Sequence, residues 1–109
     1  MIPASLPDVP PIPASLGPSA SVEDLRSEVA RLTALEKDLD RLIGEADLLL
    51  RQERQGAFEW TDARDRYEWR RQVDCRKSLS EDRLRLVRKQ AKQSRRQFHL
   101  LMSPPKKKN

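Results

Sequence analysis

The sequence predicts an all-α protein, an elongated helical hairpin or coiled coil with a disordered, proline-rich N-terminus and a short basic C-terminal tail. Apolar residues recur at helical spacing from Val22 to Leu50, and the whole chain contains only three glycines among 109 residues. Hydrophobic residues make up 37% of the chain and charged residues 36%, which leaves little side-chain material for a closed core. We therefore expect one elongated domain whose helices depend on partners to cover their apolar faces.

Residues 1–20 are rich in proline, which fixes φ and removes backbone donors, so we expect this segment to be disordered or extended. It contains a repeated pentapeptide, Ile-Pro-Ala-Ser-Leu, at residues 2–6 and 12–16. In a polyproline conformation the repeats would present Ile and Leu to two equivalent grooves on a partner. The alternative is a low-complexity tail with no ligand role.

The first helix is expected over residues 21–54. Ser21 and Asp24 have the spacing of a weak capping box, with acidic residues in the first turn. A heptad frame then predicts an apolar seam in which Glu36 is the only charge. From Leu35 onward a third apolar position widens the stripe, so we expect the C-terminal half of this helix to contact more than one helix. The two seam positions are occupied by Val22, Val29, Glu36, Ile43 and Leu50, and by Leu25, Leu32, Leu39 and Ala46; the third position by Leu35, Leu42 and Leu49.

A turn is expected over residues 55–61, because Gly56 can adopt the left-handed conformation that ends a helix and Thr61-Asp62 offers a new N-cap. Such a turn would fold the chain back on itself. An unbroken rod through Gly56 remains the alternative, since a single glycine is a weak breaker.

Four of the five aromatic residues fall in two similar triplets, residues 58–60 and 67–69. A spacing of nine residues places the triplets on opposite sides of a continuous helix, so Trp60 and Trp69 would contact different neighbours. Tryptophan and tyrosine often supply much of the binding energy at interfaces, which makes this cluster a candidate hot spot. In the alternative, one triplet packs inside the hairpin against Leu49 and Leu50.

The second helix is expected over residues 62–102, and its end is set by Pro104. A restart is an alternative near residues 78–80, where Ser78 and Glu81 have capping-box spacing; a continuous helix with Ser78 and Ser80 facing solvent accounts for the same residues. A narrow seam follows at alternating three- and four-residue steps: Leu84, Val87, Ala91, Ser94, Phe98 and Leu101.

Charge differs strongly between the two halves. Residues 20–62 contain six Lys or Arg and eleven Asp or Glu, a balance of −5, while residues 79–109 contain ten and two, a balance of +8. An antiparallel hairpin would therefore bring acidic and basic helices together. The excess basic residues are candidates for non-specific contact with a phosphate backbone, or with an acidic protein surface: Arg83, Arg85, Arg88, Lys89, Lys92, Arg95 and Arg96.

The tail, residues 103–109, combines two short patterns. Lys106, Lys107 and Lys108 follow two prolines, as in signals read by nuclear-import receptors. Ser103 lies in a Ser-Pro-x-Lys pattern favoured by cyclin-dependent kinases, which makes it a candidate phosphosite. We expect nuclear localisation, with the cytoplasm as the alternative.

The residues that catalysis uses are scarce. The chain contains one histidine, His99, and one cysteine, Cys75, with no metal-ligand spacing and no glycine-rich phosphate loop. We expect no enzyme activity, no cofactor, no metal and no small-molecule ligand. No segment approaches the ~20 apolar residues that a membrane-spanning helix needs.

The sequence therefore predicts a non-enzymatic interaction subunit of a larger multiprotein complex, docked onto other helical subunits by coiled-coil packing. One alternative is a basic-helix protein that binds nucleic acid through phosphate contacts, and another is a self-sufficient homo-oligomeric coiled coil. The predicted protein-interface residues are Leu25, Val29, Leu32, Leu35, Leu39, Leu42, Ile43, Leu49, Leu50, Trp60, Tyr67, Trp69, Leu84, Val87, Phe98 and Leu101.

Overall fold

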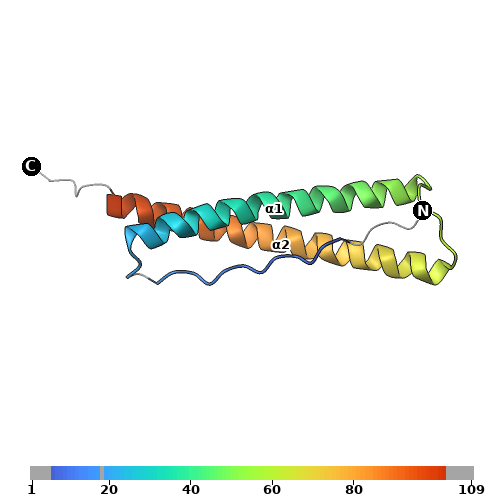
Figure 1. Cartoon of the computed structure of the whole chain (residues 1–109), viewed down its shortest axis with the longest axis horizontal. Coiled ribbons are helices and arrows are strands. Elements are labelled where there is room, and N and C mark those ends of the chain that lie inside the picture. Colours follow the sequence, from blue (N-terminus) through green and yellow to red (C-terminus); the bar gives the residue numbers. More distant parts are fainter. Residues whose placement is uncertain (1–5, 18, 103–109) are drawn as a thin grey trace, which may run out of the picture.

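Two long helices packed side by side form the protein (Figure 1). The structure is a computed structural model that describes residues 6–17 and 19–102. Helix α1 runs from Val22 to Arg54 and helix α2 from Ala63 to Met102. The molecule measures 74 × 22 × 16 Å, and the described residues contain no strand. The all-α, elongated hairpin predicted from the sequence is confirmed.

Helix α1 begins with the predicted capping box. The Ser21 hydroxyl accepts from the Asp24 amide at 3.1 Å, and the Asp24 carboxylate accepts from the Ser21 amide at 3.3 Å. Two backbone donors that have no partner within the helix are thereby satisfied, and the acidic side chains lie at the positive end of the helix dipole. This local hydrogen bonding fixes where α1 starts.

The hairpin turn follows from one glycine and one aspartate. Gly56 has φ of 76°, and the amides of Gly56 and Ala57 donate to the carbonyls of Glu53 and Gln52, both at 3.0 Å. This pairing is a Schellman motif, which closes the end of a helix. Asp62 then caps α2 by accepting from the Arg64 amide at 2.9 Å. The rod alternative is wrong because the chain reverses at this turn.

Helix α2 is continuous through the serines at which a restart was considered. Ser78 is exposed, but Ser80 is buried and its hydroxyl donates to the Arg76 carbonyl at 2.7 Å. A bond to the carbonyl four residues earlier satisfies the hydroxyl inside a helix. The expectation that Ser80 faces solvent is therefore wrong.

The buried face of α1 is rotated from the predicted seam. One predicted row is buried, but the other half of the seam, which includes Val29, Glu36 and Ile43, is only half-buried. Of the third apolar position only Leu42 is buried, while Leu35 and Leu49 are half-buried; Glu28, one heptad before Leu35, is buried as well. The buried residues of α1 are Leu25, Glu28, Leu32, Leu39, Leu42, Ala46 and Glu53.

The rotation accompanies a third layer that the sequence analysis did not predict. Residues 6–17, called the strap below, are extended and run along the hairpin before the chain enters α1 (Figure 1). Leu6 is buried in one apolar cluster with Ala46 and Val73. Val9 and Ile12 pack against a second cluster, formed by Leu32, Leu39, Leu84, Val87 and Ala91. The prolines predicted disorder or extension, and the strap is the extended form, held on the chain's own helices.

Candidate interaction surfaces

Six of the sixteen predicted interface residues are buried inside the hairpin, and eight more are half-buried. Leu25, Leu32, Leu39 and Val87 are 0% exposed, so a closed hairpin leaves nothing of them for a partner. The two helices and the strap together cover much of the apolar surface for which the sequence analysis required other subunits. Leu42 and Leu84 are also buried, and Val29, Leu35, Ile43, Leu49, Leu50 and Phe98 are half-buried.

The aromatic residues gather at the turn. The ring centroids of Trp60 and Trp69 are 5.5 Å apart, and Phe58 lies 6.5 Å from Trp60 and 5.6 Å from Trp69. The continuous helix that would separate the two tryptophans is not formed, because α2 begins after Trp60 and the turn folds Trp60 over Trp69. Trp69 also packs against the cluster that contains Leu6. Only Tyr67 among the candidate hot-spot residues is strongly exposed, at 67%.

A buried carboxylate ties α1 to the start of α2. Glu53 is 3% exposed; its carboxylate accepts from Arg66, and the Arg70 Nε lies 3.9 Å from Oε2. A carboxylate this deeply buried is costly unless it is paired, and here two half-exposed arginines supply the opposite charge. The pairing holds the two helix ends beside the turn.

The predicted complementarity between an acidic α1 and a basic α2 appears as ion pairs between the helices. Arg88 reaches Glu36 at 3.0 Å and Asp40 at 3.8 Å. The Lys77 ammonium lies 2.6 Å from the Asp47 carboxylate, and this hydrogen bond raises the pKa of Lys77 above its usual 10.5.

The seven candidate phosphate-contacting residues fall into two groups: those that contact other parts of the chain and those that remain exposed. Arg88 and Arg95 face α1, where Arg95 donates to the Thr33 hydroxyl at 3.1 Å, and Arg83 contacts the strap. On the outer face of α2, Arg85 pairs with Asp82 at 3.2 Å. The remaining three are exposed and form no ion pair with any residue that the structure describes: Lys89, Lys92 and Arg96.

A row of exposed leucines runs along α2 and was missed in the sequence analysis. Leu79, Leu86 and Leu100 are 41%, 55% and 69% exposed. They occupy one heptad position, since 79, 86 and 100 differ by multiples of seven, and residues seven apart share a face of a supercoiled helix. Gln93 occupies the same position between Leu86 and Leu100. The spacing was visible in the sequence, but the more regular seam beginning at Leu84 was taken as the sole apolar face of this helix.

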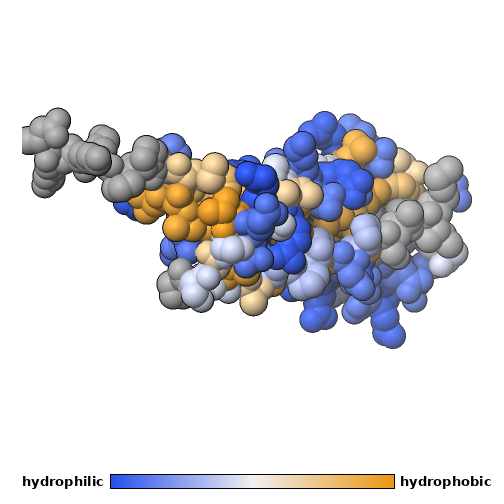
Figure 2. Space-filling model, turned by 60° about the vertical axis from the view of Figure 1, so that its left-hand side comes forward, coloured by the Kyte–Doolittle hydropathy of each residue, from blue (hydrophilic) through white to orange (hydrophobic). Residues whose placement is uncertain are grey.

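Apolar surface is concentrated at the C-terminal end of α2. Leu101 is 52% and Met102 54% exposed, directly after Leu100. Figure 2 shows apolar surface gathered at the end of the hairpin beside the grey terminal residues. The leucine row therefore ends in an apolar patch formed by residues 100–102.

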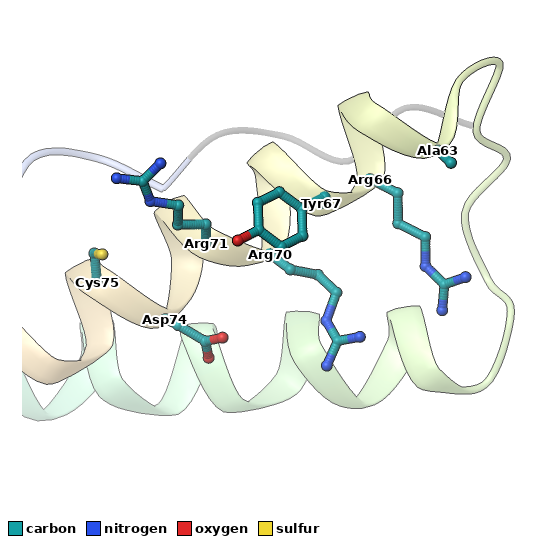
Figure 3. Close-up of a pocket in the computed structure, with 7 residues that line it drawn as sticks. All are labelled: Ala63, Arg66, Tyr67, Arg70, Arg71, Asp74 and Cys75. Carbon is teal, nitrogen blue, oxygen red and sulfur yellow. The ribbon is translucent and has the colours of Figure 1, made fainter.

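An open hollow of about 670 Å³ lies on the surface of α2 near the turn (Figure 3). Tyr67, Arg70 and Arg71 form part of its wall, and every lining residue is exposed. Ligand sites usually enclose their ligand among apolar side chains with a few fixed polar groups. This hollow does not enclose a ligand, because it is open to solvent and every side chain that forms it is exposed.

The residues considered for chemistry are isolated. His99 and Cys75 are both exposed, and Cys75 is a free thiol. The described residues contain no group of three or more His, Cys, Asp or Glu side chains placed to hold a metal ion. Within the same residues, neither helix has a stretch apolar enough to cross a lipid bilayer. The candidate phosphosite Ser103 and the candidate import residues Lys106, Lys107 and Lys108 lie outside the described residues.

Comparison with protein-family models, with curated proteins and with solved structures found no match to this chain. The functional argument therefore depends on the surfaces described above. Two of them are built by the fold: the outer face of α2, with its leucine row and basic residues, and the groove that holds the strap.

Proposed function

We propose that this protein is a non-enzymatic interaction subunit that docks onto a helix of another subunit through the outer face of α2. The observation that carries the proposal is the leucine row, Leu79, Leu86 and Leu100, which stays exposed while the hairpin and strap bury or half-bury most residues of the other seams. Leucines at heptad spacing are the contacts by which one helix packs against another in a coiled coil. Coiled-coil packing is the docking mode expected from the sequence, but the proposed surface is the outer face of α2 instead of the predicted seams.

Charge defines the kind of partner helix. Arg85, Lys89, Lys92 and Arg96 are spaced four, three and four residues apart, so they form one basic row beside the leucine row. A partner helix with leucines in its seam and Asp or Glu along the flanks would complement both rows. Such flanking charges chiefly speed association and set register, while burial of the leucines supplies most of the affinity.

Nucleic-acid binding is the second candidate, and the basic row is the observation that favours it. Four cations along about 17 Å of helix, at ~1.5 Å per residue, can follow a phosphate backbone without reading bases. The two candidates differ in salt dependence. Phosphate contacts release counterions, so binding would fall steeply with salt, whereas a leucine seam changes little.

The first experiment compares two sets of substitutions in an affinity purification from cells. Leu79→Ser/Leu86→Ser/Leu100→Ser removes the leucine row without touching the buried core, and Arg85→Gln/Lys89→Gln/Lys92→Gln/Arg96→Gln removes the basic row. The proposal expects the leucine set to lose a defined protein partner that the wild type retains in ~0.5 M salt. Retention of every partner by the leucine variant would refute docking through this face.

The same variants separate the remaining alternatives. A homo-oligomer built on the leucine row predicts that the wild-type chain sediments as a concentration-dependent oligomer and the leucine variant as a monomer. The expected nuclear localisation, which depends on Lys106, Lys107 and Lys108, is tested by imaging a fluorescent fusion before and after those lysines are replaced by glutamine.

A further inference from the structure

The strap is held through its backbone carbonyls as well as through its side chains, which include an ion pair between Asp8 and Arg76 at 3.4 Å. Arg83 Nη1 donates to the carbonyls of Val9 and Pro10 at 2.7 and 2.9 Å, and Gln90 Nε2 donates to the carbonyl of Pro13 at 3.2 Å. Arg76 donates to the carbonyl of Leu6. Backbone carbonyls are present in every peptide, so these bonds recognise a chain conformation more than a side-chain sequence.

The spacing of the three donors along α2 matches the spacing of their acceptors along the strap. Arg76, Arg83 and Gln90 are seven residues apart on α2, which corresponds to about 10.5 Å along the helix at ~1.5 Å per residue. Their acceptors are about 3.5 residues apart on the strap, which corresponds to about 11 Å at ~3.1 Å per residue in a polyproline II helix. The heptad repeat of α2 and the rise of a polyproline helix therefore stay in register.

The side chains of the strap follow the same geometry. Polyproline II has three residues per turn, so Leu6, Val9 and Ile12 lie on one side. Leu6 is buried in one apolar cluster and Val9 and Ile12 pack against the other; Pro10 and Pro13 are half-buried beside them, and Pro7 and Pro11 are exposed. The groove thus selects an apolar residue at every third position of a proline-rich segment that runs parallel to α2.

A buried acid orients one of the donors. Glu28 is 0% exposed, and its carboxylate accepts from the same Gln90 Nε2 at 2.9 Å and from Arg31 at 2.7 Å. An amide NH2 group carries two hydrogens, so Gln90 donates one to Glu28 and the other to Pro13. The buried Glu28 carboxylate is thereby satisfied, and it holds the Gln90 amide in place beside the strap.

We propose that the groove between α1 and α2 is a binding site for proline-rich peptides in the polyproline II conformation, with the strap as its resident occupant. The ligand class is a proline-rich segment with an apolar residue at every third position. An external segment of this class must displace the strap, because both use Arg76, Arg83, Gln90 and the same apolar clusters. This site adjoins the leucine row, since its donors on α2 lie three or four residues from Leu79 and Leu86, and it takes a different ligand from the proposed docking function.

The test uses the full chain with Leu6→Ser/Val9→Ser/Ile12→Ser, which weakens the strap's hold on the groove and leaves both helices unchanged. The probe is a fluorescein-labelled peptide with the sequence of residues 6–17, and the control peptide carries the same three serines while keeping every proline. We call the triple-serine variant the opened chain. Fluorescence anisotropy should show that the native peptide binds the opened chain saturably, with an affinity about tenfold or more higher than its affinity for the wild type. The control peptide should bind at least about tenfold more weakly than the native one, because its side chains leave the apolar clusters uncovered.

A matched pair of arginine substitutions in the opened chain checks the groove itself. Arg83→Ala should weaken binding of the native peptide about tenfold by removing the donor to two carbonyls, and Arg85→Ala on the outer face should change it less than about twofold. Equal binding of the native and control peptides, or no binding of either to a chain that retains its helices, overturns the proposal. If the opened chain has lost helix by circular dichroism, recovery of helix with the native peptide but not the control supports the site, and no recovery overturns it.

Discussion

Leu39 lies at the centre of the contact between the helices, and Leu39→Ala tests whether that contact is the core of a self-contained hairpin. The side chain is 0% exposed and belongs to the cluster of Leu32, Leu84, Val87 and Ala91. Removing its three terminal carbons loses roughly 2.5 kcal/mol of burial, and a residual cavity adds to this loss. Two packed helices can move together and shrink the cavity, so we expect a total of about 3 kcal/mol.

Leu48→Ala is the matched control, since Leu48 lies on the same helix but is 51% exposed. With about half of the side chain already in water and no cavity formed, the expected cost is about 1 kcal/mol or less. Urea unfolding followed at 222 nm by circular dichroism, and independently by tryptophan fluorescence, gives both free energies of unfolding. Equal losses for the two variants would refute the assignment of Leu39 to a closed core. A midpoint that depends on protein concentration would mean that the core is shared between chains.

Three further outcomes are expected. Gly56→Ala should destabilise the chain by about 1 kcal/mol because φ at Gly56 is 76°, while Gly44→Ala should stabilise it by up to about 1 kcal/mol. No neighbour lies within 4 Å of an added Cβ at either site, so both effects come from the backbone. If both substitutions shifted the melting temperature in the same direction, the backbone argument would be contradicted. The pKa of Lys77 is raised by Asp47, so their pairing stabilises the hairpin fully below the unfolded pKa of about 10.5 and is lost as pH rises through the higher folded pKa. Asp47→Asn should therefore reduce the fall in urea midpoint between about pH 9 and pH 12, and an unchanged fall would show that other groups cause it. Trp60 and Trp69 lie 5.5 Å apart, so Trp60→Phe and Trp69→Phe should each abolish the same near-ultraviolet circular dichroism band, whereas independent bands would show that the rings do not interact.

The ends of the helices were predictable because short-range hydrogen bonds determine them. Ser21 and Asp24 cap α1 through atoms three residues apart, and Gly56 closes it through a conformation that glycine adopts without steric cost. Asp62 caps α2 in the same local manner. A sequence window of a few residues contains all the atoms involved in these caps.

The candidate surfaces were harder to predict because they depend on what the rest of the chain covers. Leu25, Leu32 and Leu39 have the spacing of an interface, and only the return of α2 shows that their partner is the chain itself. Threefold spacing of Leu6, Val9 and Ile12 was the available signal for the strap. The pentapeptide repeat suggests a different period, ten residues, and its first copy falls mostly outside the described residues.

The sequence by itself determined that this protein is helical, where its helices begin and end, and that acidic and basic halves would meet. These properties arise from propensity, capping and charge, which act within a few residues or across a whole segment. Only the tertiary structure decided which side of α1 is buried, that Trp60 folds onto Trp69, and that the strap covers the groove between the helices. Heptad spacing leaves the rotation of a wide apolar face undetermined, and the third layer fixes it by burying the side that two helices alone would leave in water.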